Sequence, residues 1–270
     1  AFNNDHKALI AAALQQQDPE MEHICVLPGT TFIKVTRLVN LVQAETSVTT
    51  GSGMCPPGSI DIQSFNIAIF GNKGARPSTR FGTWLTGQGH KVERIQTDNT
   101  PLTKALLDKY DIIVLDWLVR SYSPQEAKLL ADWVDSGGGL MSMTGHTNNG
   151  TVVQRPNSLI APMGLSYNAS KGFFDGPVNQ WTRPHPLTDG ITSVSFCGGL
   201  HVDIVDDGIG INTTIGTRPQ GPVAVAQRRK AGRLFIFGDE WIEFDSEWQM
   251  TPQIERFWSN IFGWLSQRNS

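Results

Sequence analysis

From about Phe65 onward, short apolar runs alternate along the chain with longer stretches whose apolar residues recur at helical spacing. The runs Asn66–Phe70 and 111–115 are almost continuously apolar, which is typical of parallel strands buried on both faces. Further strands are predicted over Lys91–Ile95, 140–143 and 233–237. Strands that alternate with helices form right-handed β-α-β units. The pattern therefore predicts a doubly wound, mostly parallel α/β domain.

Capping residues and apolar spacing predict the helices between these strands. Pro77 opens one helix, and residues 101–110 form a second. Ser123, Pro124 and Glu126 match a capping box, with serine at the N-cap and glutamate three residues later. A closing amphipathic helix is predicted over residues 251–266. Between residues 146 and 186 the alternation is lost and a long irregular stretch is expected, followed by strand-like segments at 193–197, 199–204 and 222–226.

The first 62 residues do not follow this rhythm. Residues 7–17 are predicted to form a short helix, residues 31–42 one or two strands, and residues 46–58 a polar linker rich in glycine and proline. We therefore expect residues 1–62 to form an N-terminal appendage and linker, and residues 63–270 to form the α/β domain.

The cysteines bear on the compartment. A disulfide between Cys25 and Cys55 would close a loop of about 30 residues and stabilise the appendage by a few kcal/mol, which suits an exported protein. The start at Ala1 suggests that an upstream segment such as a signal peptide was removed, although a trimmed chain would look the same. We expect a secreted or periplasmic protein; the alternative is three reduced thiols in a cytosolic one. Cys197 is interpreted as a small buried hydrophobe.

Composition and charge exclude some partners. A chain of 270 residues with 39% hydrophobic and 17% charged residues is globular in composition. Its net charge of −3 and the lack of a basic run of five or more residues disfavour nucleic-acid binding. No window approaches the roughly 20 apolar residues that a membrane span requires. The oligomeric state is left open.

Several phrases of the sequence resemble the class I glutamine amidotransferase-like superfamily. They are NIAIF, DIIVLDWL, SPQEAKLLADWVDSGGGLMSMTG, the segment 185–191 and GRLFIFGDEW. The resemblance covers residues 65–265 and is closest to the non-amidotransferase branch that includes ThuA-like proteins. It implies a flavodoxin-like fold whose ligands gather at the carboxyl ends of the strands.

Measured against that resemblance, two catalytic positions differ. Active members carry a nucleophilic cysteine in the turn after the strand that corresponds to residues 140–143, and this turn reads Thr144-Gly145-His146. They end their last strand in a His-Pro-Glu phrase, where this chain has Gly238-Asp239-Glu240. The resemblance therefore implies that the chain is not a glutamine amidotransferase.

The remaining polar residues at these strand ends are candidates for chemistry. His146, Asp239 and Glu240 should lie near one another, where they could run acid–base catalysis or hold a divalent cation. Alternatively, Glu240 caps a loop amide and His146 starts a helix. No other cofactor is predicted, and the sequence does not identify a metal.

Aromatic side chains near the expected cleft suggest a ligand. Trp181 and Trp241, with His201, are candidate ligand-binding residues, because flat aromatic faces beside carboxylates suit sugar recognition. Other tryptophans sit at helical spacing and are expected in the core. The loop 71–74 could cradle an anion, but it matches neither a dinucleotide-binding motif nor a P-loop.

Together these features predict a secreted or periplasmic ligand-binding or interaction protein without amidotransferase activity, with carbohydrate as the suggested ligand. A hydrolase using His146, Asp239 and Glu240 is one alternative. A structural or assembly protein that makes its contacts through the appendage is the other. The sequence does not name the ligand.

Overall fold

The computed structural model describes residues 21–26, 33–38, 64–72, 74, 76–95, 99–147, 149–171 and 174–267. The chain divides into two units, Ala1–Ile62 and Gln63–Ser270. In the first unit, β1 (Met21–Val26) pairs antiparallel with β2 (Ile33–Leu38). The sequence predicts a strand at the position of β2 and none at that of β1. The predicted helix over residues 7–17, the linker and Cys55 lie outside the described residues.

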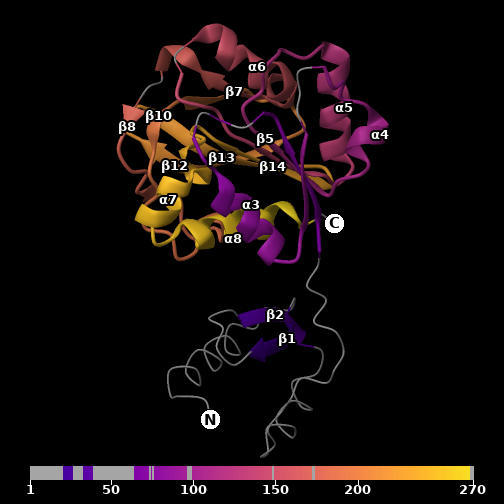
Figure 1. Cartoon of the computed structure of the whole chain (residues 1–270). Coiled ribbons are helices and arrows are strands. Elements are labelled where there is room, and N and C mark those ends of the chain that lie inside the picture. The colour runs from indigo at the N-terminus through magenta and orange to yellow at the C-terminus, as the bar shows by residue number, and fades with distance from the viewer. Residues whose placement is uncertain are drawn as a thin grey trace, which may run out of the picture. The chain divides into compact units, whose positions relative to one another are not determined.

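Eight strands of the second unit form one mixed sheet in the order β4-β3-β5-β6-β14-β13-β12-β9 (Figure 1). The five strands from β4 to β14 run parallel, and each of the last three is antiparallel to the strand before it. These strands span Asn66–Phe70 (β3), Lys91–Ile95 (β4), Ile112–Leu115 (β5), Gly139–Ser142 (β6), Gln180–Trp181 (β9), Ile211–Arg218 (β12), Gly221–Arg229 (β13) and Gly232–Phe237 (β14).

Two short antiparallel pairs accompany the main sheet. β7 (Leu165–Asn168) pairs with β11 (His201–Ile204), and β8 (Phe174–Asp175) pairs with β10 (Cys197–Gly199). Three strand-like segments were predicted between residues 193 and 226. In the first, 193–197, only Cys197 belongs to a strand, which is β10. The second, 199–204, contains β11, and the third, 222–226, lies inside the longer β13.

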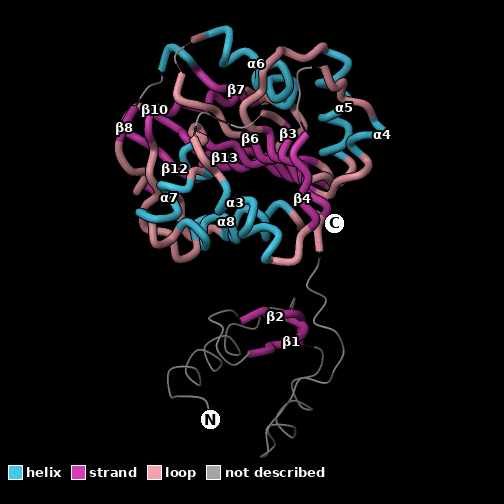
Figure 2. The backbone as a smooth tube through the Cα atoms, in the orientation of Figure 1, coloured by secondary structure: helices cyan, strands magenta, loops and turns pink. Residues whose placement is uncertain are grey.

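Helices cover both faces of the sheet (Figure 2). They span Thr79–Gly87 (α3), Lys104–Leu107 (α4), Pro124–Asp135 (α5), Gly150–Ile160 (α6), Asp245–Met250 (α7) and Ile254–Leu265 (α8), with 3-10 turns at Ala161–Met163, Ala169–Lys171, Pro186–Thr188 and Trp241–Glu243. No helix among the described residues is long and apolar enough to cross a membrane.

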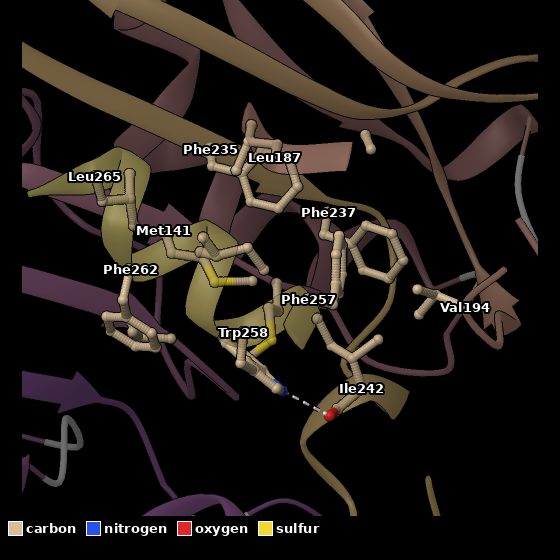
Figure 3. Close-up of a cluster of buried hydrophobic side chains, with 14 of the residues drawn as sticks. Met141, Leu187, Val194, Phe235, Phe237, Ile242, Phe257, Trp258, Phe262 and Leu265 are labelled. Atoms are coloured by element: carbon tan, nitrogen blue, oxygen red, sulfur yellow. Dashed lines mark hydrogen bonds between the residues drawn. The ribbon is translucent and has the colours of Figure 1, made fainter. Parts of the chain in front are cut away.

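The strands β3, β5, β6 and β14 are buried on both faces, as their apolar runs predict, whereas the edge strand β4 has no buried residue. In β3, Ile67 and Ile69 belong to the cluster that packs against α3 and α8, whereas Ala68 and Phe70 belong to the cluster under α5 and α6. Figure 3 shows the first cluster, in which the Trp258 indole nitrogen donates to the carbonyl of Ile242 at 3.0 Å. The predicted doubly wound, mostly parallel α/β architecture is confirmed.

The capping box predicted for α5 is present. The Ser123 hydroxyl accepts a hydrogen bond from the Glu126 amide at 3.2 Å, and the Glu126 carboxylate accepts one from the Ser123 amide at 2.9 Å. Glu126 also accepts from the Leu102 amide at 3.0 Å and pairs with Arg120 at 2.7 Å. One side chain therefore caps α5 and ties it to the segment before α4.

Two sequence predictions were wrong. The stretch 146–186 is not irregular, because α6 begins after Asn149, whose side chain accepts from the Thr151 amide at 2.9 Å. Residues 101–110 hold only the short α4 in place of a full helix.

Candidate functional site

Four carboxyl groups lie beyond the carboxyl ends of β5 and β14, the two strands that flank β6. Asp116 follows β5, Asp239 and Glu240 follow β14, and Glu243 lies in the 3-10 turn after Glu240. Each of the four is at most 3% exposed. Carboxyl ends of parallel strands share one edge of a sheet, which is where doubly wound folds bind ligands.

Arg94, in β4, connects these acidic residues. Its Nη1 lies 2.6 Å from the Asp116 carboxylate, and its Nη2 lies 3.6 Å from that of Glu243. Nη1 also donates to the Asn72 carbonyl at 2.8 Å. Because a buried charge without a partner is costly, these contacts lock the guanidinium and the two carboxyl groups to one another.

Burial favours the neutral forms of several of these acids. It raises the pKa of Glu240 to about 9, with the negative charges of Asp116 and Asp239 adding to the rise. It also raises the pKa of Glu243 well above the usual range, as Asp116 adds to the effect and Arg94 opposes it. Burial raises the pKa of Asp116 against the opposing charge of Arg94. With a pKa of about 9, Glu240 keeps its proton at neutral pH, and burial shifts Glu243 and Asp116 toward their neutral forms.

Some of the buried carboxyl oxygens have no hydrogen-bond partner among the described residues. They include Oε2 of Glu240 and both oxygens of Glu243. The Oε1 atom of Glu243 lies 3.6 Å from the point where a Cβ on Gly74 would stand, so this carboxyl group faces the loop after β3. Buried polar atoms without partners are rare in folded proteins and are features that a functional site can explain.

A groove of about 750 Å³ opens beside this cluster, between α3 and the strands β3 and β4. Its described lining contains two arginines, four hydroxyl side chains and no carboxylate. The lining residues are Ile69, Gly74, Arg76, Pro77, Ser78, Thr79, Gly82, Thr83, Thr86, Val92 and Arg94. The guanidinium carbon of Arg76 lies 4.4 Å from the centre of the Trp241 ring. The groove therefore joins the carboxylate–arginine cluster to an aromatic side chain.

The turn after β6 is filled by a tryptophan. A Cβ on Gly145 would lie 2.4 Å from the Trp117 ring and 3.0 Å from Oε1 of Glu240. Trp117 has a φ of 36°, a left-handed conformation that is unusual for a bulky residue. A cavity of only about 20 Å³ remains beside this turn. Glu240 is thus covered by Trp117 at the turn that precedes His146.

The three predicted residues His146, Asp239 and Glu240 make different contacts. His146 is exposed, and its Nδ1 lies 3.4 Å from the Cys197 carbonyl in β10. Asp239 accepts hydrogen bonds from the amides of Cys197 and Trp241, the second at 3.0 Å, so both of its oxygens hold backbone in place. Burial raises the pKa of Asp239 to about 8, against these two hydrogen bonds. Glu240 instead lies against Gly145.

No metal site is formed by these groups. Among the residues that the structure describes, no three histidine, cysteine, aspartate or glutamate side chains could hold a metal ion.

Cys197 is not the fully buried side chain predicted from the sequence. It is half-buried at the start of β10, an edge position in a two-stranded pair. Burial and the neighbouring Asp175 carboxylate raise the pKa of its thiol.

Of the three candidate ligand-binding residues, only Trp241 lies beside the groove. Trp181 is in β9, at the opposite end of the sheet from β4, where its indole nitrogen donates to the Thr192 carbonyl at 3.1 Å. His201 is 1% exposed in β11, in a separate sheet. Arg94, Asp116 and Glu243 were missed, although a charged residue directly after the buried strand β5 was a signal for Asp116.

Comparisons with known proteins concern the fold. No family model and no curated protein matches the sequence. Among solved structures, the N-terminal domain of mmIFT52 matches with a TM-score of 0.62 and 13% identity, over 75% of this chain and 98% of its own. A cytoplasmic protein from Salmonella typhimurium LT2 matches with a TM-score of 0.56 and 14% identity, over 74% of this chain and 99% of its own.

A ThuA-like protein from Parabacteroides merdae matches with a TM-score of 0.48 and 12% identity, over 76% of this chain and 90% of its own. At such identities these likenesses extend to the α/β fold and not to activity.

Proposed function

We propose that this protein is a ligand-binding module that takes a small polar molecule in the groove between α3 and β4. The observation that carries the proposal is the groove of about 750 Å³ whose lining includes Arg94, a guanidinium fixed by two fully buried carboxyl groups. Sites of this kind are concave, largely pre-formed and equipped with a few placed polar groups.

Carbohydrate is the ligand class that the lining favours. Ser78, Thr79, Thr83 and Thr86 supply hydroxyl groups that can both donate and accept hydrogen bonds. The Arg76 guanidinium stacks on the Trp241 ring beside the groove, which holds its N–H donors in place for sugar hydroxyl groups. A polyhydroxylated molecule of monosaccharide size matches this combination.

The hydrolase alternative rests on Glu240. A glutamic acid with a pKa of about 9 carries a proton at neutral pH and could serve as a general acid. However, Glu240 is 3% exposed and lies against the turn that Trp117 fills, so a substrate would have to displace the tryptophan. Glutaminase activity is not proposed, because the turn after β6 contains no cysteine.

A secreted or periplasmic location and a Cys25–Cys55 disulfide remain part of the proposal. Mass spectrometry of the unreduced protein should then yield one peptide pair joined through these cysteines, which separates on reduction. Two free thiols in protein isolated from its native source would remove the support for export.

The assembly alternative has its own test. Deleting residues 1–59 should leave ligand binding intact if the groove is the functional site. Self-association that disappears with this deletion, in a protein that binds no small molecule, would favour the assembly reading.

Filling the groove tests the binding proposal. Gly82 lines the groove within α3, and a Cβ there would meet no atom within 4 Å, so Gly82→Leu should fold normally and obstruct the site. Gly263→Leu in α8 is the matched control, since it is equally free of neighbours and lies outside the groove. Titration calorimetry with a panel of monosaccharides and sugar acids should detect binding that Gly82→Leu weakens about tenfold or more and Gly263→Leu does not. Equal binding by both variants would contradict the proposal, and steady turnover of a glycoside lost in Glu240→Gln would favour the hydrolase.

A further inference from the structure

We infer that the ligand of this groove carries an anionic group, a carboxylate or a phosphate, that is bound by Arg76 and Arg94. This inference rests on the proposed binding function and specifies the chemistry of the ligand.

The charges at the surface of the groove are of one sign. Its described lining contains two guanidinium groups and no carboxylate. Two acidic residues beside the groove, Asp116 and Glu243, are fully buried and contact Arg94. A third, Asp245, accepts a hydrogen bond from the Arg80 amide at 2.8 Å. A cleft lined by one sign of charge concentrates ligands of the opposite sign.

Arg76 is placed to receive such a group. It is exposed and forms no ion pair with any described residue. Its guanidinium stands 4.4 Å from the centre of the Trp241 ring, a cation–π contact that restricts its orientation. Stacking leaves the N–H groups at the guanidinium edge available, and these match the oxygens of a carboxylate or phosphate.

Arg94 supplies a second guanidinium at the groove. Its short contacts to Asp116 and Asn72 are made by Nη1, whereas Nη2 approaches Glu243 only at 3.6 Å. With its side chain 19% exposed, Arg94 still presents donor capacity to the groove. Because Asp116 pairs with this guanidinium, Arg94 contributes placed N–H donors, and Arg76 contributes the charge left unpaired among the described residues.

The uncharged polar residues of the lining indicate which other groups the ligand carries. The four hydroxyl side chains of the groove favour a ligand with several hydroxyl groups of its own. The combined chemistry is that of a small acidic polyol, such as a sugar acid or a sugar phosphate.

The test compares matched neutral and acidic sugars on the full chain. Glucose is paired with glucuronate and with glucose 6-phosphate, and inorganic phosphate and acetate serve as minimal anions, all followed by titration calorimetry and protein-detected NMR. At least one acidic sugar should bind about tenfold or more tightly than glucose, and added salt should weaken it.

Variants assign the effect to the groove. Arg76→Gln should abolish the preference for the acidic sugar, so that the acidic and the neutral sugar bind with similar affinity. Arg80→Gln removes a charge from α3 at an exposed position outside the lining, and it should change either affinity by less than about twofold. Whether the carboxylate or the phosphate binds better distinguishes the two sources of the anion.

The two proposals can fail separately. Glucose binding as tightly as both acidic sugars, with all three weakened by Gly82→Leu, would overturn the anion inference and leave the binding function standing. An acidic preference that survives Arg76→Gln would also overturn it. Failure of every probe to bind in the groove would overturn both.

Discussion

Glu240 shows what burial does to a single carboxyl group. With 3% exposure, its pKa of about 9 stands far above the value near 4.5 of a solvated glutamate. Between these values the unfolded chain gives up the proton while the folded protein keeps it. The contribution of Glu240 to stability is therefore complete below about pH 4.5 and is lost as the pH rises toward 9.

We predict that the protein loses stability between pH 5 and pH 9, because Asp239 and Glu243 act in the same direction as Glu240. Glu240→Gln, which keeps the neutral form at every pH, should make this loss shallower without removing it. Melting temperatures over this pH range check the prediction, with the exposed Glu255→Gln on α8 as control. A wild-type protein that gains stability toward pH 9 would contradict the assignment of buried neutral acids.

The neighbours of Gly145 leave no room for a side chain at this position. A methyl group there would lie 2.4 Å from the Trp117 ring and 3.0 Å from Glu240. We predict that Gly145→Ala destabilises the fold by about 1–3 kcal/mol, measured by urea unfolding. The cost should fall in a Trp117→Ala background, where the ring is absent. In α8, Gly263→Ala meets no neighbouring atom and should be neutral or slightly stabilising. An equal cost for Gly145→Ala in both backgrounds would show that Trp117 is not the obstacle.

At the scale of elements, the cap of α5 illustrates a signal that survives from sequence to structure. Ser123, Pro124 and Glu126 lie within four residues, so their interaction depends on local geometry that the sequence fixes. The strands β3, β5, β6 and β14 were predictable for a similar reason, because burial on both faces demands nearly continuous apolar runs. β4 (KVERI) is an edge strand without a buried residue and lacks this signal.

The elements that were missed have weaker signals. The composition of α6 disfavours a helix, because the segment contains Pro156 and several β-branched residues. Only the spacing of its buried residues is helical, at Val153, Pro156, Leu159 and Ile160. β12 (INTTIGTR) presents polar side chains along much of its length, and it is specified by pairing with β13 and β9. Tertiary contacts decide both.

We predict that Ser123→Ala destabilises the protein by about 1 kcal/mol, since the α5 N-terminus loses its side-chain acceptor. Lys128→Ala, which removes an exposed pair with Asp132 on the same helix, should cost less than about 0.5 kcal/mol. Chemical unfolding of the two variants gives the comparison. If both lost the same stability, the capping box would contribute no more than a surface ion pair.

At the scale of the molecule, the residues at the carboxyl edge of the sheet differ in how far the sequence reveals them. Asp239 and Glu240 were predictable because they follow an evident last strand. Arg94 was hidden, because its role depends on β4 standing beside β3 and on Glu243 reaching it from the far end of the chain. The resemblance to amidotransferases directed attention to His146, which the fold places against β10 instead.

If the groove between α3 and β4 is the binding site, amide NMR of the full chain should show it during titration with glucuronate and glucose 6-phosphate. We expect saturable shifts to concentrate on Gly74, Thr79, Thr83 and Arg94, with smaller changes around Trp181 and His201. Shifts centred on the turn at Gly145, on β9 or on no part of the groove would contradict it.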